Sequence, residues 1–215
     1  MLPTLVALLV TLDPGHSPLT RGALSARGRG EVEFNVEMVQ RVSRELAAAT
    51  KVKVRRTRAD WESATLRRRA ERAAGASLLL SVHHDSPHPD DFDLWWDGEV
   101  ARLHSAAGRG FSLHVRGDRP DSVRVAKAIA KALVEAGFTP SRYHVDYLPV
   151  VDESLGIYDR RHLGLLNWAR VPAVILECGF VSHLEEEVEL GQSDRQDRMA
   201  RAIAAGVLEG LGRKP

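Results

Sequence analysis

The chain has 215 residues, of which 44% are hydrophobic and 27% are charged, and its formal net charge is +1 at pH 7. These values are typical of a globular protein with one ordinary core, and they give no electrostatic basis for a nucleic-acid partner. The single cysteine, Cys178, excludes an intrachain disulfide and a zinc site built from cysteines. No segment is apolar over the ~20 residues that a spanning helix needs, so we expect no membrane span.

The apolar run over residues 2–10 predicts a buried first strand that leads into the turn Asp13-Pro14-Gly15. The run lacks the basic start and small-residue cleavage site of an export signal, although a trimmed signal stays an alternative. Apolar periodicity predicts the elements that follow. In chain order these are a polar loop over 17–30, an amphipathic helix over 31–49, a strand over 52–54, a helix over 61–74 and a strand over 77–82.

This alternation of strands and helices is typical of a parallel sheet covered by helices. Residues 87–110 break the alternation with prolines, glycines and acidic residues, and they predict an inserted loop or hairpin near the site. No internal repeat or low-complexity linker divides the chain, so we expect a single α/β domain over residues 1–215. The remaining elements are a strand over 111–115, a helix over 122–136, an irregular stretch over 141–167, a strand over 173–176, a capping box at 182–185 and a helix over about 199–211.

Three of the strand-like runs end in a side chain that could bind a metal or move a proton. His16 and His83 each follow an apolar run, and Glu177 follows the run 173–176. Ligands in open α/β folds sit at the carboxyl edge of the sheet, which is where these side chains would meet. Glu31, in the first turn of the predicted helix 31–49, can return to the same edge.

Two imidazoles and one carboxylate are a donor set that zinc prefers, with a position left for water. The positive charge left on such a metal would lower the pKa of a bound water and polarise a substrate carbonyl. Glu177 would then act as general base and proton donor. Each residue also has an ordinary alternative: a hydrogen-bonding role for His16 and His83, and compensation of the helix dipole for Glu31. Glu177 is the strongest candidate for a functional residue, because burying a carboxylate that has no partner or function costs folding free energy.

These motifs resemble those of the zinc-dependent N-acetylmuramoyl-L-alanine amidases of the bacterial cell wall, known as amidase family 3. The resemblance runs from about residue 5 to residue 210, with five motifs in the family's order. They are Leu12-Asp13-Pro14-Gly15-His16, then Glu31 at the start of the first long helix, then Thr57-Arg58-Ala59-Asp60 with Leu66, Arg69 and Ala73 at the family's intervals, then Ser81-Val82-His83, and finally the segment from Pro172 to Phe180.

The resemblance implies a mainly parallel, twisted sheet with helices on both faces. It implies hydrolysis of the amide between N-acetylmuramic acid and the L-alanine of the stem peptide, in peptidoglycan or in muropeptides. It assigns His16, Glu31 and His83 as ligands of one zinc ion per chain and Glu177 as the catalytic carboxylate. It also implies action in the bacterial envelope, in the periplasm or outside the cell. The need for a protein activator stays open, although the stretch 139–171 is too short for the family's regulatory helix.

Three further residues are candidate substrate contacts. His84, which with Asp85 replaces the family's small residue and asparagine, could touch substrate or lie behind the site, since adjacent strand residues point opposite ways. Arg160 and Arg161 could bind a stem-peptide carboxylate, or could be solvated charges.

Three rival functions remain open at this point. A phage or prophage endolysin would use the same chemistry at lysis. A catalytically inactive peptidoglycan-binding domain is a second rival, which the complete set of four site residues disfavours. A zinc peptidase that cleaves an ordinary peptide bond is the third.

Overall fold

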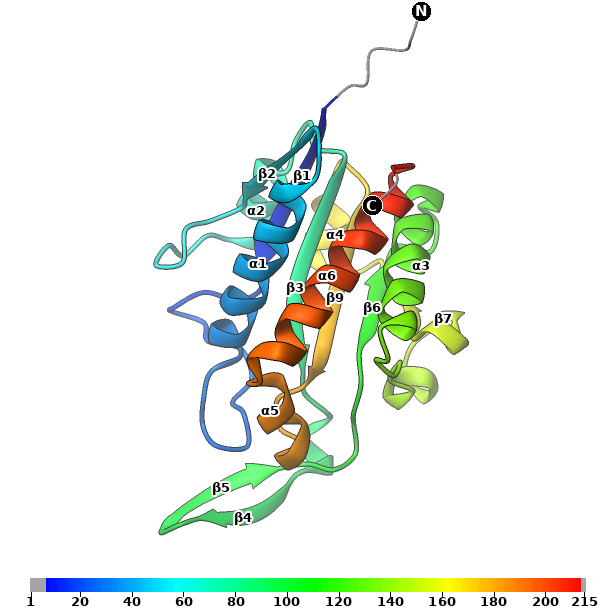
Figure 1. Ribbon diagram of the computed structural model, residues 1–215. Helices are drawn as coiled ribbons and strands as arrows, with labels where there is room; N and C mark the ends of the chain where they lie inside the picture. The colour runs from blue at the N-terminus through cyan, green and yellow to red at the C-terminus, as the bar shows by residue number, and fades with distance from the viewer. Residues whose placement is uncertain (1–6, 214–215) are drawn as a thin grey trace, which may run out of the picture.

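A seven-stranded sheet forms the centre of the protein, whose computed structural model describes residues 7–213 (Figure 1). The strands of this sheet are β1 Leu8–Pro14, β2 Val52–Arg56, β3 Leu78–Asp85, β6 Ser112–Val115, β7 Val150–Asp152, β8 Ile157–Asp159 and β9 Ala173–Phe180. Their order is β2-β1-β3-β9-β6-β8-β7, and only the pairings β6–β9 and β7–β8 are antiparallel. The predicted mainly parallel sheet is therefore confirmed, while residues 2–6 of the predicted first strand lie outside the described residues.

Helices cover both faces of this sheet, as predicted. The helices are α1 Glu31–Ala48, α2 Leu66–Arg72, α3 Pro120–Glu135, α4 Gly164–Trp168, α5 Leu184–Leu190 and α6 Ser193–Gly210. The front face in Figure 1 carries α1, α6 and α3, and α2 and α4 lie behind the sheet. Each face has its own apolar cluster, so the sheet is buried from both sides, as parallel sheets generally are.

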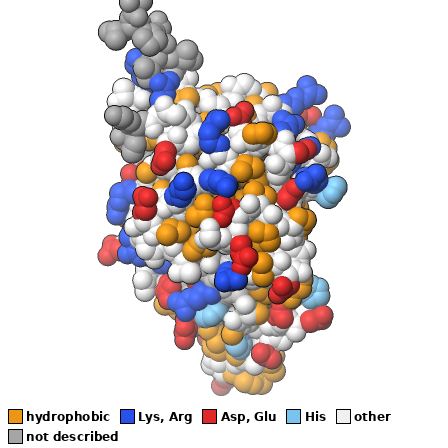
Figure 2. All heavy atoms as spheres, turned by 90° about the vertical axis from the view of Figure 1, so that its right-hand side faces the viewer, with side chains coloured by type: hydrophobic (Ala, Val, Ile, Leu, Met, Phe, Trp, Pro, Cys, Tyr) orange, Lys and Arg blue, Asp and Glu red, His pale blue; other side chains and the backbone are white. Residues whose placement is uncertain are grey.

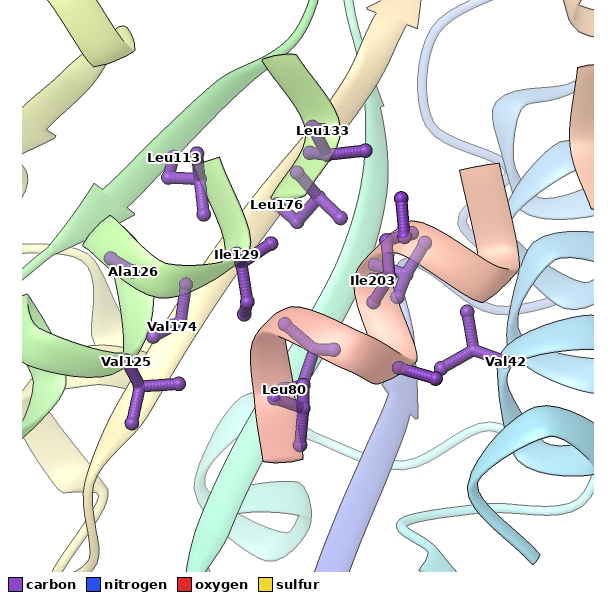
Figure 3. Packing of buried hydrophobic residues seen from close by; sticks show 14 of the residues in the cluster. Val42, Leu80, Leu113, Val125, Ala126, Ile129, Leu133, Val174, Leu176 and Ile203 are labelled. Carbon is purple, nitrogen blue, oxygen red and sulfur yellow. The ribbon is translucent and has the colours of Figure 1, made fainter. Parts of the chain in front are cut away.

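The larger apolar cluster lies between the sheet and the front helices. Figure 3 shows Ile129 of α3 and Ile203 of α6 directed toward Leu176 of β9 and Leu80 of β3. All four side chains are fully buried. Val42 of α1 closes the cluster at its other end. This packing fixes α1 against the sheet, and with it the position of the residue that begins α1.

Two predicted strands, β3 and β9, continue through the candidate site residues. β3 continues through both histidines to Asp85, and β9 continues through Glu177 to Phe180. Periodicity ends a strand at the first polar residue, but here the polar side chains stand over a cleft at one end of the sheet. His83 and Glu177 are therefore strand residues held by the β3–β9 ladder, not residues of the following loops.

Several predicted helix starts were wrong by one to six residues. The last helix, expected from about residue 199, begins at Ser193. The helix expected from residue 61 begins at Leu66, because Thr65 is extended and its hydroxyl accepts a hydrogen bond from the Arg68 amide at 3.3 Å. The cap of α5 is His183 and not Ser182, since Nδ1 of His183 accepts from the amides of Glu185 and Glu186, each at 3.3 Å.

The stretch 141–167, predicted to be irregular, contains short elements. These are β7, β8, α4 and the 3-10 turns η2 Tyr143–Asp146 and η3 Glu153–Leu155. The only α-helix among residues 139–171, all of which the structure describes, is the five-residue α4. Its Leu165 and Leu166 pack into the rear apolar cluster, so it is part of the body of the protein.

The predicted insertion at 87–110 is a short turn followed by a hairpin. The turn is η1 Pro89–Asp91, and the strands are β4 Asp93–Asp97 and β5 Val100–His104. The hairpin extends from the lower end of the molecule in Figure 1, and hydrophobic side chains gather at that end in Figure 2. Trp95 ties the hairpin to the body, because its Nε1 donates to the Ala26 carbonyl at 3.0 Å.

Acidic and basic side chains are mixed over the face shown in Figure 2, with no large area of one sign. Among residues 7–213, the structure has no helix long and apolar enough to cross a membrane.

Candidate active site

The three predicted zinc ligands lie together at the lower end of the sheet. Glu31 is the first residue of α1, His83 is in β3, and His16 follows β1 in the left-handed backbone region, with φ of 61°. Nε2 of His16 lies 2.9 Å from Oε2 of Glu31, and Nδ1 of His83 lies 3.0 Å from Oε1. One donor atom from each residue is within 4.8 Å of the others. The fold thus brings all three residues into one cluster.

The carboxylate of Glu31 is fixed from several directions. Oε2 accepts from the Ala23 amide at 3.1 Å, and Oε1 accepts from Nδ2 of Asn35 at 3.0 Å and from the His84 amide at 3.2 Å. Burial alone would raise the pKa of Glu31, but its contacts with the two imidazoles outweigh burial and hold the pKa far below the ordinary value. The group is therefore a negatively charged, preoriented oxygen donor.

This donor set fits zinc. Two ligands at zinc's usual bond lengths in a tetrahedron are about 3.3 Å apart. The nitrogen–oxygen distances of 2.9 and 3.0 Å are close to that separation. The two imidazoles remain partly accessible, with side-chain exposures of 32% for His16 and 17% for His83, so solvent can reach the cluster. A small shift of the rings away from Glu31 would admit a cation between the three donors.

Glu177 stands beside this cluster on the sheet. It is opposite His83 on the β3 side of β9 and opposite Ser112 on the β6 side. Its Oε2 is buried and has no hydrogen-bond partner among the described residues. Burial, followed by repulsion from Asp85 and Glu31, raises the pKa of Glu177 well above the ordinary value. A carboxyl with an unoccupied oxygen and a raised pKa is suited to exchange protons with a substrate.

His16, His83 and Glu177 line one cleft of about 760 Å³, whereas Glu31 lies behind its surface. The cleft also contains a second cluster, formed by Asp85, His114 and His144, and the side chain of Arg160. The Asp85 carboxylate lies 2.6 Å from Nε2 of His144. Burial first, and then the neighbouring His144, lowers the pKa of His114 well below its ordinary value, so its imidazole is neutral.

The three predicted substrate contacts have different positions. Arg160 lines the cleft. His84 and Arg161 are not among the described residues that line it. Nδ1 of His84 lies 2.7 Å from Oδ1 of Asn35 behind the site, and Nε of Arg161 donates to Asp159 at 2.9 Å. Contact of these three residues with substrate stays a prediction.

Sequence reasoning did not identify Asn35, His114 or His144 as site residues. Asn35 has a local signal, because a buried polar residue four positions after Glu31 lies on the same helix face. His114 and His144 have no such signal. They come from β6 and η2, and only the folded chain places them beside Asp85 of β3.

The cluster of His16, Glu31 and His83 leaves no space for a side chain at position 22. Gly22 has φ of 74°, and a Cβ there would lie 2.6 Å from Cδ2 of His16 and would collide with Oε2 of Glu31. We expect Gly22→Ala to weaken zinc binding by about 10–100-fold, since it moves two ligands at once. Competition titration with a zinc chelator measures the affinity. Gly75→Ala is the matched control, because Gly75 also has φ of 74° but has open space around it. Equal zinc affinities for the two variants would contradict the prediction.

The fold and the site together define a candidate metal-dependent hydrolase. A family model described as N-acetylmuramoyl-L-alanine amidase matches residues 10–209, and the chain belongs to this family.

Three relatives illustrate the similarity. The chain is 26% identical over 224 residues to N-acetylmuramoyl-L-alanine amidase AmiA of Escherichia coli, covering 93% of this chain and 75% of AmiA. It is 24% identical to the probable amidase AmiB of Haemophilus influenzae over 94% of this chain, and it spans about half, 51%, of AmiB. The solved catalytic domain of CwlV, an amidase of Bacillus (Paenibacillus) polymyxa, has a TM-score of 0.76 and 26% identity, covering 96% of this chain and 99% of the other.

Proposed function

We propose that residues 1–215 are a single catalytic domain that hydrolyses the amide between N-acetylmuramic acid and L-alanine of the peptidoglycan stem peptide, with zinc as cofactor. One observation carries the proposal: the donor atoms of His16, Glu31 and His83 lie together at the cleft. Glu177, which is paired with His83 in the sheet, lines the same cleft. Membership of the amidase family supports the choice of bond. The complete set of four residues argues against an inactive peptidoglycan-binding domain.

The chain's own residues would divide the work as follows. His16, Glu31 and His83 would hold zinc, which supplies a Lewis acid that polarises the scissile carbonyl and acidifies the attacking water. Glu177 would take the proton from that water and deliver it to the leaving amine nitrogen. Its raised pKa suits both steps, because the same group must be a base first and an acid afterwards.

Arg160 is our proposed contact for a stem-peptide carboxylate, since it is a cationic side chain that lines the cleft. Truncation to Arg160→Ala is then expected to raise KM with little change in kcat, because a uniform binding contact is lost. The proposed place of action is the bacterial envelope. The described stretch 139–171 forms part of the body and contains no helix longer than α4, so we expect no autoinhibitory helix in this stretch.

Metal removal and product analysis test the proposal. We expect purified peptidoglycan to yield free stem peptides with L-alanine at the amino end, identified by mass. Dialysis against a chelator should abolish the release, and added zinc should restore it, because three of the four site residues are metal donors. Peptides cut inside the stem would indicate a zinc peptidase instead. Absence of any release from zinc-loaded protein would favour a binding role. Lysis genes beside the coding gene would identify a phage endolysin with the same chemistry.

A further inference from the structure

The cleft contains a second cluster with the same composition as the proposed zinc site. Asp85 of β3, His114 of β6 and His144 of η2 each place one donor atom within 4.8 Å of the others. The rings of His114 and His144 meet edge to face, with centroids 5.3 Å apart. As in the first cluster, the donors are two imidazoles and one carboxylate.

The second cluster contains a ring nitrogen, Nδ1 of His114, that has no hydrogen-bond partner among the described residues. His114 is 2% exposed, and its Nδ1 is buried. Its Nε2 has only a long contact of 3.3 Å to the Ser112 hydroxyl. A buried polar atom without a partner is costly, and each such atom in a native protein calls for an explanation, of which an ion is one. His114 is also neutral, the form in which imidazole binds metals.

Carboxylates near the second cluster favour a cation. Those of Asp85 and Glu177 line the same cleft, and the Arg160 guanidinium offsets part of their negative charge. The first zinc would compensate Glu31 directly. Oδ1 of Asp85 accepts from the Ser86 amide at 2.8 Å, and its Oδ2 lies 2.6 Å from Nε2 of His144, so a carboxylate oxygen and an imidazole nitrogen already converge as two metal donors would.

We infer that Asp85, His114 and His144 form a second site for a divalent transition-metal ion such as zinc, in the same cleft as the His16, Glu31 and His83 site. The donor set is the one that zinc prefers, and the open cleft supplies water for the remaining positions. The saturated protein would then bind two zinc ions and not the single ion that the sequence predicts. The inference rests on these donors alone and does not require the proposed reaction.

Metal stoichiometry on the purified chain tests the inference. Each protein is dialysed against buffered zinc, and zinc per chain is measured by mass spectrometry. We expect two equivalents in the wild type, one in His144→Gln, one in His114→Gln and one in His16→Ala. His88→Ala is the matched control and should retain two, because His88 has an exposed ring outside the cleft and pairs with Asp90. The ring of His144 is more accessible than that of His114, so His144→Gln remains informative if the His114 variant does not fold.

The outcomes separate the two sites. One equivalent in the wild type that is lost in His16→Ala and kept in His144→Gln would overturn the second site and leave the first intact. One equivalent that is kept in His16→Ala and lost in His144→Gln would support the second site and contradict the proposed function. Visible absorption of the cobalt-substituted protein is an independent readout, since loss of a ligand from the second site should remove one of two sets of bands.

Discussion

Glu177→Gln is expected to lower kcat for stem-peptide release by about 10²–10⁴-fold, the usual contribution of a general acid–base group. Glutamine keeps the size and one oxygen of the side chain but cannot take up a proton from water. KM and zinc content should stay near the wild-type values, because His16, Glu31 and His83 are untouched. The rate is measured on soluble muropeptide at saturation, with zinc counted in the same preparation.

Loss of folding is not expected to contribute to this effect. The raised pKa of Glu177 means that the folded protein favours the protonated carboxyl. The stability gained from that preference is present below the unfolded pKa of 4.5 and is lost as pH rises through the folded value. Above pH 4.5 the raised pKa therefore lowers the free energy of unfolding, so at pH 7 Glu177→Gln should be at least as stable as the wild type. Urea unfolding at pH 7 checks this.

Glu186→Gln is the matched control for this substitution. Glu186 is also a buried glutamate with a raised pKa, but it accepts from the Phe180 and Gly110 amides outside the cleft. Its variant should retain wild-type kcat. A Glu177→Gln protein that keeps more than a tenth of the wild-type rate, while Glu186→Gln is fully active, would remove Glu177 from the proposed role.

The elements that sequence predicts well here are long and strongly periodic. The helix expected over 31–49 is α1, Glu31–Ala48, because apolar residues recur along one face. Four of them pack against the sheet, namely Met38, Val39, Val42 and Leu46. Short elements are not predicted by apolar periodicity. β7 and β8 have three residues each, fewer than one repeat of a helix pattern, and they form because neighbouring strands pair with them.

The candidate site also has residues that the sequence predicts and residues that it does not. His16, His83 and Glu177 follow recognisable apolar runs, and the topology brings the ends of β1, β3 and β9 together. His114 lies on β6, which runs antiparallel to β9, so the rule that places ligands beyond the carboxyl ends of parallel strands does not find it. His144 depends on a 3-10 turn whose position no local pattern predicts.

Asp13, in the first motif of the chain, is expected to have a large effect on stability. Its fully buried carboxylate accepts from Nη1 of Arg69 at 3.1 Å, from the Ser81 hydroxyl at 2.6 Å and from the Thr57 hydroxyl. These partners come from α2, from β3 and from the residue that follows β2, so one side chain joins three neighbouring segments to β1. The same network holds the chain three residues before His16.

Asp13→Ala is expected to lower the free energy of unfolding by about 3–5 kcal/mol, because it leaves the Arg69 guanidinium buried without its counter-charge. For a protein of this length, that corresponds to a fall in Tm of roughly 6–20 °C. Urea and thermal unfolding measure both quantities. Glu71→Ala on the same helix is the control, since its pair with Arg67 is exposed and is expected to contribute at most about 1 kcal/mol.

The double variant Asp13→Leu/Arg69→Met separates a lost ion pair from lost packing. If the cost of Asp13→Ala comes mainly from an uncompensated charge, removing both charges while filling the space with apolar groups should recover much of the stability. The double variant should then be more stable than the sum of the two single changes to alanine predicts. Additive losses would instead show that the Ser81 and Thr57 hydroxyls, left without their acceptor, account for the destabilisation.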